Sequence, residues 1–226
     1  MHSKKYIINI LRKLYSKKIS VVSDSKALKN LSYENMEFAR LDHHRVFRKG
    51  FSEVIYCENK THDQVKKITK ALLKRKDSLL RTRADKRLYD FVKKEFPVLK
   101  YNEAGRVIYL KKNGLKNKKT VLILTAGTGD IPVAEEARVT LEVMGNRVKT
   151  IYDVGVAGIH RLLDNMPEIS KANVIIVVAG MEGALGSVIG GLTDKPVIAV
   201  PTSVGYGSSF KGIAPLLTMM NSCAPG

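Results

Sequence analysis

The stretch VLILTAGTGD, residues 121–130, decides the fold of the second half of this chain. It begins as a continuous apolar run, which is typical of a strand buried on both faces, and it ends in a turn of small residues. The segment that follows, residues 131–144, carries apolar side chains at helical intervals. The order is therefore strand, glycine-bearing loop and helix, and backbone N–H groups at such a junction favour an anion.

The same order repeats along the chain. Apolar runs at residues 147–152, 172–178 and 196–200 each lead into glycine-rich sequence. Together these units predict an α/β domain with a parallel sheet of at least four strands and helices on both faces. In such a sheet the ligand lies beyond the carboxyl ends of the strands, so we expect all the loops to line one rim.

The positive charge of the chain lies in its first half. Residues 1–118 hold 31 Lys and Arg against 12 Asp and Glu, whereas residues 119–226 hold 8 against 9. A basic half suggests a nucleic acid or a phosphorylated ligand as partner. Because the lysines are spread and not interleaved with aromatic residues, we favour solvated helix faces and do not expect nucleic acid.

Composition excludes two classes of protein. No apolar run reaches the roughly 18–20 residues needed to span a membrane. The basic N-terminus lacks the apolar stretch and the cleavage site of a signal peptide. The two cysteines, Cys57 and Cys223, cannot form a disulfide framework, so a reducing cytoplasmic location is expected.

Patterns in the first half predict a small basic α/β domain. We expect helices over residues 4–17, from 32–38 onward, from Thr61 or Asp63 to about 75, and over 85–96. Strands are expected at residues 53–57, 78–82, 98–102 and 106–111, the last two joined by a hairpin-like turn. Residues 20–30 are polar and predict a connection, and residues 111–119 form a basic linker. The predicted units are residues 1–37, 38–118 and 119–226.

A last helix is predicted over residues 212–221, and the chain stops five residues later. A sheet domain of this kind usually has another element after such a turn. We therefore expect the sequence to be truncated at its C-terminus.

The second half holds several candidates for chemistry. Glu182 lies among small residues, where a carboxylate is either a base or metal ligand, or an acid in the first turn of a helix. Asp130 either caps its helix or holds a ribose hydroxyl. His160 is either structural or part of the rim. Cys223 is either a small buried residue or a nucleophile with a lowered pKa, whereas Cys57 is assigned to the core.

Two further groups are candidates for binding phosphate or ribose. Asp42, Arg45 and Arg48 share one face if their segment is helical, and this face is either a phosphate site or an ordinary surface pair. Two predicted loops have small residues that let the backbone approach a ligand closely. These loop candidates are Thr128, Gly129, Asp130, Ser203, Gly205, Tyr206 and Gly207. The sequence carries no zinc spacing, no P-loop and no GxSxG elbow.

Taken in order, the motifs are more specific than any one of them. The second half reads TAGTGDIPVAEEA at 125–137, YDVGVAGIHR at 152–161, AGMEGAL at 179–185, VPTSVGYG at 200–207 and NSCAPG at 221–226. The first half adds LDHHR at 41–45, RKGF at 48–51, EVI at 53–55 and TRA at 82–84. Over residues 38–226 the chain resembles the LarB family, whose second half is similar to the purine-synthesis mutase PurE. Gly129 stands where that family commonly has Ser, and Gly186 where it commonly has Pro.

The resemblance implies a PurE-like three-layer domain and a specific reaction. The substrate would be nicotinic acid adenine dinucleotide, carboxylated on its pyridinium ring with CO2 or bicarbonate, in nickel-pincer cofactor synthesis. Cys223 would add to the ring as a thiolate, with Glu182 as the acid–base group. Cleavage of the phosphoanhydride would release AMP, with Mg²⁺ as the expected aid. The resemblance also implies a symmetric homo-oligomer, an octamer.

Two other classes of function stay open. One is a PurE-like carboxylase or mutase acting on an aminoimidazole ribonucleotide, for which Cys223 and the basic half have no evident role. The other is a non-enzymatic nucleotide-binding or RNA-binding module, suggested by the charge of the first half.

Overall fold

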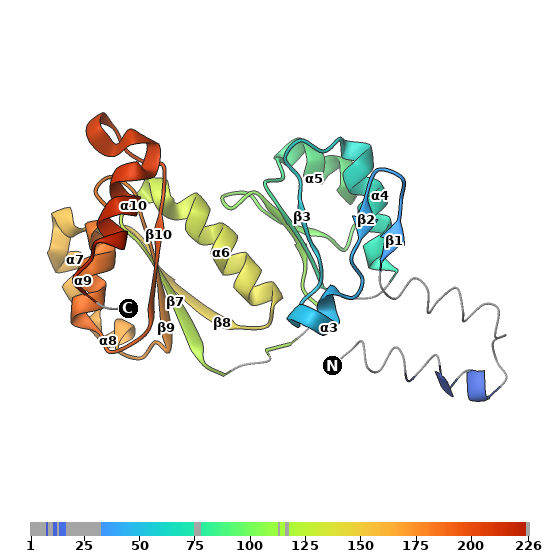
Figure 1. Cartoon of the computed structure of the whole chain (residues 1–226), viewed down its shortest axis with the longest axis horizontal. Coiled ribbons are helices and arrows are strands. Elements are labelled where there is room, and N and C mark those ends of the chain that lie inside the picture. Colours follow the sequence, from blue (N-terminus) through green and yellow to red (C-terminus); the bar gives the residue numbers. More distant parts are fainter. Residues whose placement is uncertain are drawn as a thin grey trace.

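The structure is a computed structural model of the whole chain (Figure 1). It describes residues 8, 11–12, 14–16, 33–74, 78–112, 114–115 and 118–224. Residues 8, 11–12 and 14–15 are helical, and the rest of the helix predicted over residues 4–17 lies outside the described residues. The connection predicted over residues 20–30 lies outside them as well.

The second half forms a four-stranded sheet in which every neighbouring pair of strands is parallel, as predicted. The order across the sheet is β10-β9-β7-β8. The strands are β7 (Thr120–Thr125), β8 (Arg147–Ile151), β9 (Val174–Ala179) and β10 (Val197–Pro201). Each lies within about two residues of the segment that predicts it. The central strands β7 and β9 are the most apolar, because they are covered on both faces, whereas the edge strand β8 alternates apolar and polar residues.

Helices cover both faces of this sheet, which confirms the three-layer prediction. On one face, Ile123 and Val178 pack against Ala134 of α6 (Ile131–Val143). On the other face, Leu122 and Leu124 belong to a core built with α7 (Ile159–Leu163), α8 (Met166–Ile169) and α9 (Ala184–Leu192). The last helix, α10 (Ile213–Met220), packs against α9 and β10. Short 3₁₀ turns complete the connections at η1 (Thr128–Asp130), η2 (Val156–Gly158) and η3 (Gly207–Gly212).

The first half forms a second, mixed sheet with the order β3-β4-β6-β5. Its strands are β3 (Val54–Tyr56), β4 (Leu79–Thr82), β5 (Lys100–Asn102) and β6 (Val107–Leu110). β3 and β4 are parallel, and β6 runs antiparallel to both its neighbours. One face is covered by α4 (His62–Leu73) and α5 (Lys86–Lys93). Of the two caps that the sequence allows for α4, the structure has the hydroxyl of Thr61. The carboxylate of Asp85 caps α5 in the same way.

The prediction that a helix starts at residues 32–38 is wrong. This segment instead holds β1 (Glu34–Asn35), which pairs antiparallel with β2 (Arg40–Leu41). The Asn35 side chain accepts a hydrogen bond from the backbone N–H of Glu37, and Glu37 has a left-handed φ of 66°. A local side-chain bond of this kind competes with helix formation and favours a turn.

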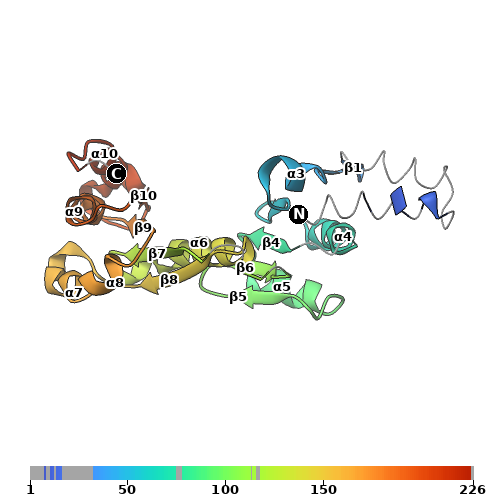
Figure 2. The same ribbon diagram turned by 90° about the horizontal axis from the view of Figure 1, so that it is seen from below.

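The two sheets meet across α6, which lies between them (Figures 1 and 2). Leu80 of β4 and Val107 of β6 pack against Val139 and Val143 of α6 in a separate apolar core. One helix thus serves both sheets, and it starts directly after the first loop of the second half.

Within the described residues, the helices are all too short or too polar to cross a lipid bilayer.

Candidate active site

The carboxyl ends of the four parallel strands carry the loops that the sequence predicts to form a rim. We call residues 126–130, 152–158, 180–183 and 202–207 the rim loops. Their first residues continue the pairing of the sheet: the Ala126 N–H donates to Val178, and the Thr202 N–H donates to Ala179, both at 3.0 Å. The Val154 N–H donates to the Thr125 carbonyl in the same way. The rim loops are therefore neighbours in the order of the strands that they follow.

Asp130 ties two of the rim loops together. Its side chain accepts a hydrogen bond from the Thr202 hydroxyl at 2.6 Å and another from the Gly127 N–H at 3.0 Å. Only 2% of the residue is exposed. The sequence left Asp130 either to cap its helix or to hold a ribose hydroxyl. The structure shows no side-chain cap bond from Asp130 to α6, and both carboxylate oxygens accept hydrogen bonds from the rim loops instead.

The absence of side chains lets the rim loops approach one another. A Cβ built on Gly180 would lie 2.1 Å from the Val204 carbonyl oxygen, and the neighbouring Met181 N–H donates to that oxygen. A Cβ on Gly129 would lie 2.9 Å from a methyl group of Val204. The serine that the family commonly has at position 129 would thus press on Val204 in this chain.

The predicted functional side chains of the rim face solvent. Thr128, His160, Glu182, Ser203 and Tyr206 are all exposed. Glu182 lies between two residues with left-handed backbone, at φ 52° and 73° on its two sides, which turns its segment outward at the end of β9. The glycines at 205 and 207 also have positive φ, at 159° and 57°. These side chains share one edge of the sheet and are free to meet a ligand from outside.

Sequence reasoning missed two rim residues, Asp153 and Thr202. Asp153 has a left-handed φ of 60°, its N–H donates to the Thr125 hydroxyl at 2.9 Å, and its carboxylate pairs with Arg161 at 2.5 Å. Thr202 donates a hydrogen bond to Asp130, whereas the sequence analysis selected only its neighbour Ser203, as a candidate for binding phosphate or ribose. The signal was the position of Thr125 and Thr202 at strand ends, where a hydroxyl is the first group able to reach the next loop.

Cys223 does not lie with the rim loops within one chain. Its neighbour Ser222 accepts a hydrogen bond from the Ser187 hydroxyl, and Ala224 lies against Gly190. Both partners are in the body of α9, which starts at the rim and runs away from it. A hollow of about 210 Å³ lies there, lined in part by Ser187, Ser222 and Ala224.

The two cysteines differ in accessibility. Cys57 was assigned to the core from the sequence. Cys223 is exposed, whereas Cys57 is buried in the core of the first sheet. Burial raises the pKa of the Cys57 thiol to about 11, against the smaller lowering effect of the Arg81 charge. At neutral pH the Cys57 thiol is therefore protonated and inert.

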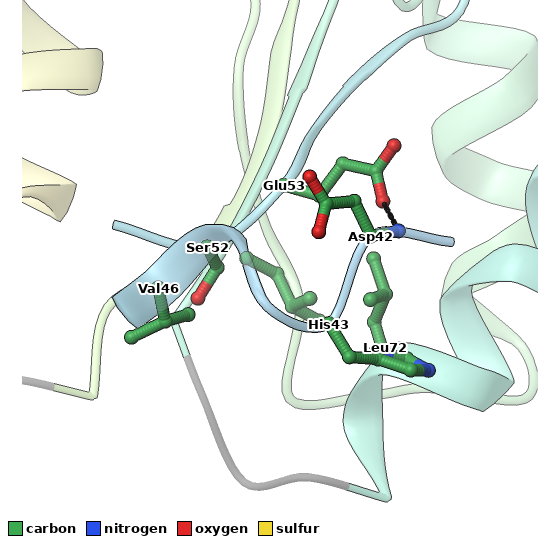
Figure 3. Close-up of a pocket in the computed structure, with 7 residues that line it drawn as sticks. Asp42, His43, Val46, Ser52, Glu53 and Leu72 are labelled. Carbon is green, nitrogen blue, oxygen red and sulfur yellow. Dashed lines mark hydrogen bonds between the residues drawn. The ribbon is translucent and has the colours of Figure 1, made fainter. Parts of the chain in front are cut away.

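The group around Asp42 forms a second polar site at α3 (Arg45–Lys49), shown in Figure 3. The Asp42 N–H donates to the Glu53 carboxylate at 2.7 Å, and these residues line a pocket with His43, Val46, Ser52, Leu72 and Leu79. The Arg48 guanidinium binds the Asp42 carboxylate. Burial raises the pKa of Asp42, but the hydrogen bond and charge of Arg48 outweigh it and the pKa is lowered.

The other predicted cation of this site is held differently. The Arg45 guanidinium lies over the Phe51 ring, 5.1 Å from its centre. Its buried Nε has no hydrogen-bond partner among the described residues. Both Figure 1 and Figure 2 place α3 well away from the rim loops, so one chain does not bring Asp42, Arg45 and Arg48 to Glu182.

A metal site is not preformed in the part of the chain that the structure describes. No three His, Cys, Asp or Glu side chains are grouped there so as to hold an ion. The described residues therefore do not by themselves fit a bound Mg²⁺.

Both halves of the chain match known protein families. Residues 33–112 match the family described as LarB/PurE-like N-terminal domain, and residues 120–225 match AIR carboxylase. The chain is similar to the uncharacterized protein MJ0165 of Methanocaldococcus jannaschii, with 44% identity over 218 residues, covering 92% of this chain and 84% of that protein. It is also similar to an N5-carboxyaminoimidazole ribonucleotide mutase of the same organism, with 38% identity over 84 residues, covering 36% of this chain and 51% of the mutase. The chain belongs to the LarB family, and its C-terminal half is PurE-like, of the carboxylase and mutase type.

Proposed function

We propose that this protein carboxylates the pyridinium ring of nicotinic acid adenine dinucleotide and cleaves its phosphoanhydride. The products are pyridinium-3,5-biscarboxylic acid mononucleotide and AMP, in nickel-pincer cofactor synthesis. Membership of the family supports a carboxylase-type reaction. The observation that carries the proposal is the rim, where loops from four parallel strands are tied together and present Glu182, His160 and Ser203 to solvent.

The dinucleotide would lie along the rim loops. Thr128 and Gly129 on one loop, and Gly205 and Gly207 on another, are exposed and have small side chains or none. The exposed ring of Tyr206 lies between the two glycines in the sequence. Such loops suit a diphosphate and a flat ring. In this proposal Asp130 acts by fixing the two loops against each other, since its oxygens already accept hydrogen bonds from Thr202 and Gly127.

The proposed chemistry is covalent catalysis by Cys223. The thiolate adds to the ring carbon next to the nitrogen, and the ring electrons move onto nitrogen to give a neutral enamine. The enamine carbon attacks CO2, forming a carbon–carbon bond and a carboxylate. Glu182 removes the proton from that carbon, and expulsion of the thiolate restores the pyridinium. The net change is replacement of a ring proton by a carboxylate. A free thiol is required throughout, which fits a reducing cytoplasmic location.

Mg²⁺ enters the proposal only as a counter-ion for the diphosphate of the substrate, where it would neutralise charge during phosphoanhydride cleavage. No step above is routed through it.

The site is proposed to be completed by neighbouring copies in a symmetric homo-oligomer, an octamer by family resemblance. Within one chain α3, which carries Arg45 and Arg48, lies apart from the rim loops. The neighbours of Cys223 contact the body of α9 and not the rim loops. The last part of the chain also exposes large apolar side chains, which mark an interaction surface. They are Leu192, Ile198, Ile213, Leu216, Leu217 and Met220. Light scattering coupled to gel filtration tests this, and a monomeric enzyme with full activity would contradict it.

The test of the proposed function is incubation with nicotinic acid adenine dinucleotide, ¹³C-bicarbonate and Mg²⁺, followed by product mass. We expect AMP and a mononucleotide that carries one ¹³C carboxylate. AMP without labelled carboxylate would reduce the protein to a hydrolase and contradict the proposal. A parallel arm without Mg²⁺ tests whether cleavage of the phosphoanhydride needs the ion.

The second candidate is a PurE-like mutase or carboxylase, favoured by the identity to the N5-carboxyaminoimidazole ribonucleotide mutase. Turnover of that nucleotide, with none of the dinucleotide, would select this alternative. A nucleic-acid-binding role would instead show as RNA affinity that falls steeply with salt concentration.

A further inference from the structure

The first domain contacts the start of α6, next to the rim. The turn that follows β5 presses on this helix: a Cβ built on Gly105 would lie 2.7 Å from the backbone nitrogen of Glu136. Arg83, in the loop after β4, pairs with the Glu136 side chain at 3.3 Å. These contacts join the two halves near the N-terminal end of α6, which directly follows the rim loop that contains Asp130.

Glu135 is the centre of this junction. Its carboxylate accepts hydrogen bonds from Asn102 of the first domain, from Arg138 one turn along α6 and from the hydroxyl of Tyr152. Only 9% of the residue is exposed. The hydrogen bonds of Arg138 lower the pKa of Glu135 to about 2 against the raising effect of burial, with Tyr152 and Asn102 adding to the lowering. The carboxylate is therefore ionised at any physiological pH, and its donors come from three separate elements.

Tyr152 connects this junction to the rim, because it is the first residue of the rim loop 152–158. It is the residue directly after β8, and the next residue, Asp153, has the left-handed backbone that turns the chain into its rim loop. The Asp153 carboxylate binds Arg161 beside His160. A shift of Tyr152 must therefore move the start of the loop that ends at the proposed substrate contact.

Asn102 has two separable tasks. Its Oδ1 accepts from the Gly105 N–H at 2.7 Å, which closes the turn, and its Nδ2 donates to Glu135. An aspartate at this position keeps the acceptor for Gly105 but replaces the donor with a second negative charge. The two tasks can thus be tested apart.

We infer that Asn102 and Glu135 are positioning residues through which the first domain sets the conformation of the rim loop 152–158. The first domain then acts on the site at a distance, as the partner that holds the Glu135–Tyr152 bond in place. This deepens the proposed function and rests on it only for the kinetic readout below.

The first measurement is hydrogen–deuterium exchange of the full-length chain, which needs no substrate. In Asn102→Asp we expect about a tenfold faster exchange in the peptide covering residues 152–163, because one hydrogen bond to a charged, buried group is lost and a repulsion is added. Asn102→Ala should give a smaller change. The matched control is Glu142→Gln, which removes the other carboxylate partner of Arg138 on the same helix and reaches Asn102 only indirectly, through Arg138 and Glu135.

The second measurement is the kinetics of the same variants with the dinucleotide. Asn102→Asp should raise KM several-fold and leave kcat nearly unchanged, since the loop is displaced but the reacting groups are intact. Glu142→Gln should change neither value. A change in kcat alone would overturn the inference.

Unchanged exchange in residues 152–163 would also overturn it, as would a rise spread evenly over all peptides, which reports global destabilisation. If the wild type does not carboxylate the dinucleotide, the proposed function fails, while the exchange result still decides whether the first domain holds the rim loop.

Discussion

The buried acids of the second half have hydrogen-bond partners, whereas a buried arginine of the first half has none among the described residues. In the second half, Asp130 is held by Thr202 and Gly127, and Glu135 is held by Arg138, Tyr152 and Asn102. In the first half, Arg81 is 0% exposed, and none of its three guanidinium nitrogens has a partner within the described residues. A partnered buried charge fixes neighbouring loops, whereas an unpartnered one costs stability. The second half thus uses its buried charges to build the rim, and the first half gains no such contact from Arg81.

The largest effect is expected at Asp130. Asp130→Ala leaves the Thr202 hydroxyl and the Gly127 N–H without their acceptor, and we expect a loss of about 3 kcal/mol in the free energy of unfolding. Chemical denaturation measures it. Asp164→Ala, at an exposed aspartate after α7, is the control and should stay within about 0.5 kcal/mol of the wild type. Equal effects of the two changes would mean that the Asp130 clamp does not hold the rim.

Replacement of Arg81 should raise stability, whereas replacement of Asp130 should lower it. Burial lowers the pKa of its guanidinium to about 10, which leaves the group charged at neutral pH in an apolar core. Arg81→Met keeps most of the volume and removes the charge, so we expect stability to rise by about 2 kcal/mol. Arg87→Met on the exposed face of α5 is the control, with little expected change. A loss of stability in Arg81→Met would show that the guanidinium has a partner in solution.

Glu135 gives a smaller, pH-dependent effect. Its pKa in the folded chain, about 2, lies below the ordinary value of 4.5, so its contribution is present above pH 4.5 and is lost as the pH falls toward 2. Between pH 5 and pH 3, the stability advantage of the wild type over Glu135→Gln should shrink by just under about 2 kcal/mol. Thermal unfolding of both proteins across this range measures it. A constant difference over the range would contradict the lowered pKa.

The smallest effect on stability is expected at the exposed Arg48–Asp42 pair. The side chains are 51% and 30% exposed, so Arg48→Ala should change stability by less than about 0.5 kcal/mol. If Arg48 meets substrate phosphate in the assembled enzyme, the same variant should raise KM for the dinucleotide. Lys86→Ala, which breaks another exposed ion pair, with Asp90, is the control and should alter neither quantity. An unchanged KM in Arg48→Ala would remove Arg48 from the substrate site.

More of the fold than of the candidate site could be predicted from the sequence. Strands such as β7 and β9 are continuous apolar runs, and a local pattern is enough to find them. The turn at Glu37 was missed because it is closed by local hydrogen bonds, to the Asn35 side chain and between Met36 and Ala39, that the apolar pattern does not reveal. The rim loops were found, since glycine and small residues mark strand ends, but the direction of each side chain was not.

What the sequence could not supply are contacts between distant segments. The Asp130–Thr202 bond spans 72 positions, and the Asn102–Glu135 bond spans 33. The burial of Arg81 depends on which face of β4 the helices cover, and alternation alone does not assign that face. The place of Cys223 beside α9 likewise depends on how α10 packs, and no motif encodes it.

The central claim is that Cys223 forms a covalent bond with the pyridinium ring, and its direct test is Cys223→Ser. Turnover should be abolished while dinucleotide affinity stays close to that of the wild type, because a serine hydroxyl is a poor nucleophile and a poor leaving group. The wild type, and Cys57→Ser as the matched control at the buried cysteine, should both show a new near-ultraviolet band from the dearomatised ring on addition of the dinucleotide. Carboxylation by Cys223→Ser at close to the wild-type rate would contradict covalent catalysis and favour direct carboxylation.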